Sequence, residues 1–148
     1  MISSEILRRF PYFADVSEER LRDVAHVSEV IKHPAGTVLF RENDKAAHLL
    51  IIVDGEVDIQ YTLGNGELRT IDTLVSGEMI MWSALVEPYL STAIGTTRRE
   101  TTLVAIDAEK LRALCEEDHE LGYRMFTSLT TLLANRLNGA RAQLATID

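Results

Sequence analysis

The fold class of this chain is decided by residues 49–63, Leu49-Leu50-Ile51-Ile52-Val53-Asp54-Gly55-Glu56-Val57-Asp58-Ile59-Gln60-Tyr61-Thr62-Leu63. The two runs at 49–53 and 57–63 are rich in β-branched residues, which favour strands. Asp54-Gly55 separates them and supplies residues that tolerate a positive φ, as a tight hairpin turn requires. The stretch therefore predicts two adjacent antiparallel strands.

Short β-rich runs of the same kind recur on both sides of this hairpin. They are separated by turn residues, of which Gly64-Asn65-Gly66 is a second strong hairpin signal. Regular spacing of short strands predicts a sandwich or barrel, and we expect a jelly roll, or double-stranded β-helix, over residues 27–106. The further expected strands are 27–31, 37–40, 68–74, 92–97 and 101–106.

Helices are expected before and after the sheet. In residues 1–26, Ser3 or Ser4 can cap a helix that ends near Arg9, Pro11 interrupts the chain, and Ser17 can cap a second helix. The chain is thus predicted to be mainly β with flanking helices, and to form a single domain over residues 1–148.

The last part of the chain, residues 107–148, is predicted to hold two helices. Asp107 is a suitable cap for a helix over 108–116, and Asp118 for a long helix that reaches about Ala145. Met125, Leu129 and Leu132 can pack this long helix on its own sheet. A second apolar stripe favours pairing with another copy, so we expect a homodimer whose interface includes Phe126, Leu133, Leu137, Ala140 and Leu144.

Charge and composition narrow the class of partner. The 148 residues include 23 acidic and 15 basic side chains, for a net charge of −8. Such a balance disfavours nucleic acid and anionic membranes as partners. Cys115 is the sole cysteine, and no apolar run has the length of a membrane span, so we expect a cytoplasmic protein.

Residues 77–93 contain the residues that are expected to bind a ligand. Gly77 allows a tight turn, and Glu78-Met79-Ile80-Met81-Trp82 is expected to form one helical turn that Pro88 ends soon afterwards. The free N–H groups of a helix start suit an anion. Ser91-Thr92-Ala93 then returns to a strand, with polar side chains turned into a concavity.

This segment resembles the phosphate-binding cassette of cyclic nucleotide-binding domains. In that family the glutamate, here Glu78, holds the ribose 2′-hydroxyl, and an arginine clamps the cyclic phosphate. The arginine's place falls here on Leu90 or Ser91, neither of which carries a positive charge. Arg98 or Arg99 on the next strand is expected to reach across to the ligand in place of the cassette arginine. The expected ligand-binding residues are Gly77, Glu78, Met79, Ile80, Ser91, Thr92 and Ala93.

The resemblance extends over nearly the whole chain. Residues 7–19, 33–44 and 50–57 are similar to the helical entry, first strands and central hairpin of the catabolite-activator and FNR-like regulators. This resemblance implies that the last helix forms the dimer interface and covers the nucleotide pocket. We expect no helix-turn-helix after residue 145, so the DNA-reading half of those regulators is expected to be absent. The expected function is therefore a stand-alone, non-enzymatic sensor of cAMP or cGMP without another cofactor.

Two alternatives stay open. A degenerate relative could keep the fold as a dimeric scaffold for a protein partner, or could bind another small ligand. Enzymatic and metal-dependent readings are weaker: His26, His33, His48 and His119 are scattered rather than clustered, and nothing marks Cys115 as an activated nucleophile. No metal site is expected, although a haem is not dismissed.

Overall fold

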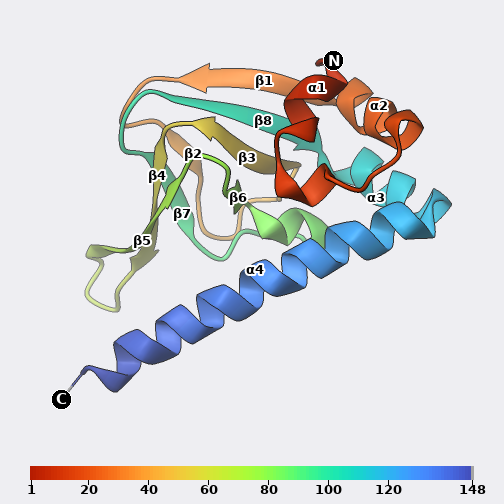
Figure 1. Cartoon of the computed structure of the whole chain (residues 1–148). Coiled ribbons are helices and arrows are strands. Elements are labelled where there is room, and N and C mark those ends of the chain that lie inside the picture. The colour runs from red at the N-terminus through yellow and green to blue at the C-terminus, as the bar shows by residue number, and fades with distance from the viewer. Residues whose placement is uncertain (148) are drawn as a thin grey trace.

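Two antiparallel sheets form the body of the protein in the computed structural model, which describes residues 1–147 (Figure 1). Each sheet has four strands, in the orders β1-β8-β3-β6 and β2-β7-β4-β5. This arrangement confirms the jelly-roll prediction. The strands are β1 (Ser28–His33), β2 (Val38–Phe40), β3 (His48–Asp54), β4 (Glu56–Thr62), β5 (Leu68–Val75), β6 (Met79–Ile80), β7 (Ile94–Thr97) and β8 (Thr101–Asp107).

Helices flank the sheets on both sides in sequence, as expected. Ser3, Ser17, Asp107 and Asp118 each accept a backbone N–H bond at the start of a helix, so the predicted caps are confirmed. The helices are α1 (Ser4–Arg8), η1 (Pro11–Phe13), α2 (Glu18–His26), η2 (Trp82–Leu85), α3 (Ala108–Glu117) and α4 (His119–Ala145), where η marks a 3₁₀-helix.

The prediction that the strands on either side of Asp54-Gly55 pair with each other is wrong. β3 pairs with β6 and β8, β4 pairs with β5 and β7, and the chain crosses from one sheet to the other at Gly55. Its φ of 138° is a conformation that side chains rarely adopt, and a Cβ there would come within 2.3 Å of Thr101 Oγ1. Thr101 itself is fully buried, and its hydroxyl accepts the Glu56 amide proton at 3.2 Å. Glycine is therefore required by both backbone geometry and space at this crossing.

The hydrophobic core lies between the sheets and continues under the N-terminal helices and the first half of α4. Met125 and Leu129 of α4 are buried in it, which confirms that one face of this helix packs on its own domain. Beyond that point α4 continues as a long rod whose end lies apart from the body (Figure 1). Its last turns consist of exposed residues.

The predicted helical turn over residues 78–82 is wrong. Met79 and Ile80 instead form β6, which pairs with Ile51 and Leu50 of β3, and both side chains are buried. Met81 then takes a left-handed conformation, with a φ of 58°, and the 3₁₀-helix η2 begins only at Trp82. Burial against β3 outweighs local helix preference for these apolar residues.

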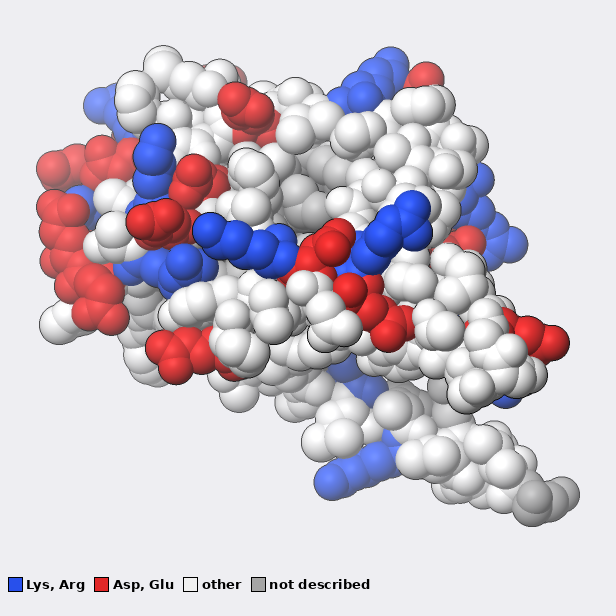
Figure 2. Space-filling view, turned by 180° about the vertical axis from the view of Figure 1, so that it is seen from behind, with Lys and Arg blue, Asp and Glu red and all other residues white. Residues whose placement is uncertain are grey.

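The acidic side chains are unevenly spread. Figure 2 shows Asp and Glu gathered at the end of the molecule where the N-terminal helices and the start of α4 lie, and a hollow near the middle of this face. Within residues 1–147, no helix combines the length and the apolar character needed to cross a bilayer.

Candidate ligand-binding site

A cavity of about 830 Å³ separates the jelly roll from α4. Its walls come from strands β4, β5 and β6, from η2, from residues 91–93 and from the middle of α4. A volume of this order is typical of sites for small molecules and nucleotides, which range over about 300–1,000 Å³. The principal lining residues are Phe40, Ile59, Tyr61, Ile71, Asp72, Leu74, Glu78, Met79, Ile80, Met81, Trp82, Ser91, Thr92, Ala93, Leu132, Leu133, Arg136, Leu137, Ala140 and Gln143.

Six of the seven predicted ligand-binding residues line this cavity: Glu78, Met79, Ile80, Ser91, Thr92 and Ala93. Gly77 is the exception. It takes a φ of 90° in the turn before Glu78, and its amide donates to the Ile52 carbonyl at 2.7 Å. The role of Gly77 is thus to turn the chain so that Glu78 reaches the cavity.

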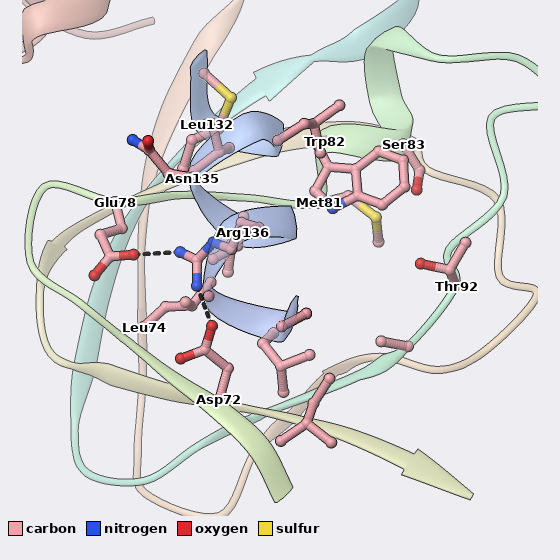
Figure 3. Close-up of a pocket in the computed structure, with 18 of the residues that line it drawn as sticks. Asp72, Leu74, Glu78, Met81, Trp82, Ser83, Thr92, Leu132, Asn135 and Arg136 are labelled. Atoms are coloured by element: carbon pink, nitrogen blue, oxygen red, sulfur yellow. Dashed lines mark hydrogen bonds and ion pairs between the residues drawn. The ribbon is translucent and has the colours of Figure 1, made fainter. Parts of the chain in front are cut away.

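Glu78 is joined to α4 by an ion pair at one side of the cavity. The guanidinium of Arg136 donates to the Glu78 carboxylate through one terminal nitrogen and to the Asp72 carboxylate through the other (Figure 3). Each of the three side chains retains about a third or more of its solvent exposure, at 31%, 33% and 42% for Arg136, Glu78 and Asp72. The bridge therefore lies at the cavity wall rather than in the dry core.

A bulge in β5 explains why Asp72 faces this site. The β4–β5 register advances by two residues on β5, from Thr70 to Asp72, while β4 advances by one, from Gln60 to Ile59. Neighbouring residues of a regular strand point to opposite faces, but a bulge interrupts the alternation. Ile71 and Asp72 consequently both line the cavity.

The backbone at Met79 is not free to bind an anion. Its amide donates to the Tyr12 hydroxyl at 3.1 Å, and that hydroxyl donates in turn to the Gly77 carbonyl at 3.0 Å. The prediction that the N–H groups around Met79 to Met81 form a helix start is wrong, because Met79 belongs to β6 and its amide proton is already paired.

Ser91 is likewise engaged with its own segment. Its hydroxyl donates to the Ala93 carbonyl at 2.7 Å and accepts the Ala93 amide proton at 3.3 Å, and the residue is buried. Thr92 is exposed and lines the cavity. Leu90 forms an isolated β-bridge with Lys45 and is absent from the described cavity lining. Of the two candidate places for the cassette arginine, only Ser91 faces the cavity.

The expectation that Arg98 or Arg99 reaches the site is wrong. Arg99 pairs with Asp54 and Glu56, at 3.2 Å in each case, near the β3–β4 turn. Arg98 lies 3.8 Å from Asp58 at the same end of the sheet. Neither is among the described residues that line the cavity.

Arg136 is the site residue that sequence reasoning missed. A faint signal exists: Leu132, Arg136 and Ala140 recur every four residues, so they share one face of the helix. Arg136 is a single cation on a face that otherwise presents apolar and small side chains. Its two carboxylate partners lie 58 and 64 residues away, and the sequence offers no guide to that pairing.

The predicted dimer stripe divides into two sets. Leu133, Leu137 and Ala140 line the cavity, whereas Phe126 and Leu144 lie away from it and are 42% and 67% exposed. Leu137 also keeps half of its surface exposed. Trp82 is half-buried against the core and lines the cavity as well. The homodimer stays a prediction.

Comparisons with known proteins agree with this geometry. Residues 30–118 match the sequence profile of the cyclic nucleotide-binding domain, while no curated protein sequence matches the chain. A proposed cyclic nucleotide-binding protein of Geobacter metallireducens is similar in structure, with 31% identity, a TM-score of 0.83, and coverage of 93% of this chain and 99% of that one.

Two further solved structures have the same fold. A cyclic nucleotide-binding domain of Methylobacillus flagellatus gives a TM-score of 0.80 at 23% identity, covering 97% of this chain and 82% of that one. The regulatory domain of Toxoplasma gondii PKA, crystallised with cAMP, gives a TM-score of 0.67 at 25% identity, covering 75% and 42%. The chain described here belongs to the cyclic nucleotide-binding domain family.

Proposed function

We propose that this protein is a non-enzymatic, ligand-sensing regulatory module whose ligand occupies the cavity between the jelly roll and α4. The observation that carries this proposal is the cavity itself: about 830 Å³, with cassette residues on one side and α4 on the other. A ligand there touches both the rigid sheets and the helix. Its binding energy can therefore favour one position of α4 over another.

The proposed ligand is a cyclic nucleotide, cAMP or cGMP. Family membership supports this choice, as does a relative crystallised with cAMP. Within the cavity, Glu78 is the proposed acceptor for a ribose hydroxyl, and Thr92 offers an exposed hydroxyl. Trp82 and Tyr61 supply aromatic surface for a base. The proposed setting is cytoplasmic, as a dimer joined along α4.

A second candidate function rests on the absence of the cassette arginine. Ser91 stands in the cavity where that arginine is expected, and its hydroxyl is already paired with Ala93. The charged groups among the described lining residues are Asp72, Glu78 and Arg136, so carboxylates outnumber cations there. These features favour a ligand other than a cyclic nucleotide, or a scaffold for a protein partner, as the alternative.

Calorimetric titration with cAMP and with cGMP at low ionic strength tests the proposal. Binding in the micromolar range supports nucleotide sensing, and silence up to millimolar ligand supports the alternative. Ala140→Trp, which fills the cavity from α4, should abolish the heat of binding. Ala134→Trp is the matched control, because Ala134 is an exposed alanine of the same helix and is not among the described cavity-lining residues.

A further inference from the structure

The cavity contains a single cation within the described part of the chain. Of the residues that line it, Arg136 alone is a lysine or arginine. It extends from α4 toward β5 and the residue before β6, where Asp72 and Glu78 hold its guanidinium (Figure 3). An arginine placed between two carboxylates has its charge more than compensated.

The cassette offers an incoming anion no counter-ion of its own. Leu90 is outside the described cavity lining, Ser91 is uncharged, and Arg99 is paired with Asp54 and Glu56 near the β3–β4 turn. A charged group taken out of water needs a partner of opposite charge. The negative charge of any anionic ligand in this cavity must therefore be balanced by a positive charge on α4.

We propose that Arg136 is the anion-binding residue of this site. In the absence of ligand, Asp72 and Glu78 occupy its guanidinium. This inference rests on the proposed function and adds to it the residue that recognises the ligand's charge. The guanidinium carries five N–H donors in a rigid fork, which suits two oxygens of a phosphate. A lysine offers a point charge without that geometry.

The same arrangement makes ligand recognition competitive. Asp72 and Glu78 bind the donors that the phosphate requires, so they oppose anion binding by their charge and by occupying the guanidinium. Asp72 also accepts the Thr73 amide proton at 2.9 Å, which fixes its carboxylate at the bulge. Because Arg136 belongs to α4, its exchange of partners alters the main polar tie between α4 and the sheets at this cavity.

Figure 3 shows where the Arg136 ion pairs lie relative to the other residues that line the cavity. Glu78, Arg136 and Asp72 lie together at one side of the cavity, and Thr92 lies at the other side with Trp82 and Met81 between them in this view. The phosphate of the bound ligand is accordingly expected beside Arg136. The uncharged part of the ligand then faces the apolar side chains of the cavity.

The test compares a charged ligand with a neutral one of similar shape, cAMP and adenosine, by calorimetry on the full chain. Arg136→Met should weaken cAMP binding about ten- to a hundredfold and leave adenosine binding within about twofold. Arg136→Lys should retain part of the cAMP affinity. Asp72→Asn should strengthen cAMP binding several-fold, because it removes a competing charge while Arg136 remains.

Arg124→Met is the matched control, since Arg124 lies on the same helix and pairs with Asp15 and Glu120, outside the described cavity lining. Its affinities for both ligands should equal those of the unaltered protein. Circular dichroism of each variant shows whether α4 is retained, and Asp72→Asn tests the inference even if Arg136→Met fails to fold.

The outcomes separate this inference from the proposed function. If cAMP binds the unaltered protein and Arg136→Met equally well, Arg136 is only a structural tie, and nucleotide sensing stands without it. If only Asp72→Asn binds cAMP, the inference holds and the native chain is not a cAMP sensor. If neither binds cAMP at millimolar concentration, both proposals are overturned.

Discussion

The hydroxyl of Tyr12 lies 3.0 Å from the carbonyl oxygen of Gly77, 65 residues further along the chain. Through this bond, and through the Met79 amide proton that it accepts, the N-terminal 3₁₀-helix holds the start of the cassette. Burial raises the pKa of the Tyr12 hydroxyl, so it stays protonated and able to donate at neutral pH.

Tyr12→Phe should remove both bonds while keeping the ring in place. The Met79 amide would then be left without its partner, and we expect a loss of about 1–3 kcal/mol in the free energy of unfolding. Urea denaturation followed by tryptophan fluorescence measures it, because the single tryptophan, Trp82, follows Met79 by three residues. An unchanged midpoint would mean that water replaces the tyrosine hydroxyl at no cost.

Gly55→Ala should be among the most damaging small substitutions in this protein. The new Cβ would overlap Thr101, and alanine does not tolerate a φ of 138°. We expect at least about 2 kcal/mol of destabilisation by urea denaturation. Gly64→Ala provides the comparison, since a Cβ at Gly64 meets nothing within 4 Å. Equal stability of the two variants would contradict the close approach at Gly55.

The thiol of Cys115 should be inert in the folded protein. Burial raises its pKa to about 11. The unfolded thiol ionises near its ordinary pKa of about 8.5, so the stability linked to this group is present below that pH and falls as the pH rises toward 11. Ellman's reagent should react slowly with the native protein at mildly alkaline pH and rapidly in urea. Cys115→Ser should reduce the alkaline loss of stability.

Asp118 should make the start of α4 sensitive to acid. The backbone N–H of Leu121 is the main group that lowers the pKa of Asp118, with help from Glu120 N–H and Arg20. A lowered pKa contributes stability above the unfolded pKa of about 3.9, and this contribution is lost as the pH falls through the folded value.

The comparison of Asp118→Asn with the unaltered protein isolates this effect from other carboxylates. Asparagine keeps the cap without the charge. The thermal midpoint of the variant, followed by circular dichroism, should fall less between neutral pH and about pH 3 than that of the unaltered protein. If the thermal midpoints of the two proteins fall by the same amount with pH, Asp118 does not contribute to the acid sensitivity.

Self-association should depend on the exposed apolar side of α4. Leu137→Glu combined with Leu144→Glu should convert a dimer into a monomer, because charged residues in an apolar seam would be left unpaired. Light scattering coupled to size exclusion gives the mass. Leu68→Glu is the control, since Leu68 is 55% exposed on β5. If the double variant keeps the mass of the unaltered protein, the dimer interface does not use these residues.

Much of the fold could be predicted because its signals are local. The hairpin turn at Gly64-Asn65-Gly66 between β4 and β5, the caps at Asp107 and Asp118, and the strand runs each depend on neighbours in sequence, and the structure contains them. The predicted pairing across Asp54-Gly55 fails because β3 and β4 belong to different sheets. β6 was missed because two residues carry no periodicity. Only pairing with β3 makes them a strand.

The candidate site was predictable where it follows the cassette and not where it depends on tertiary contacts. Glu78 and Thr92 line the cavity as expected. The Arg136 bridge could not be foreseen, because it joins α4 to a carboxylate that reaches the cavity through the β5 bulge. The pairing of Ser91 with Ala93 was equally hidden, since a serine hydroxyl can serve a ligand or its own backbone.

The four-residue spacing of Leu132, Arg136 and Ala140 has a consequence for how α4 can move. With a rise of about 1.5 Å per residue, four residues span about 6 Å, so a slide of about that length would bring Leu132 or Ala140 to the place of Arg136. Neither can satisfy the carboxylates of Asp72 and Glu78. The bridge therefore adds a polar preference for one register of α4 to the preference set by the burial of Met125 and Leu129. A ligand that takes the guanidinium for itself removes the polar part of this preference.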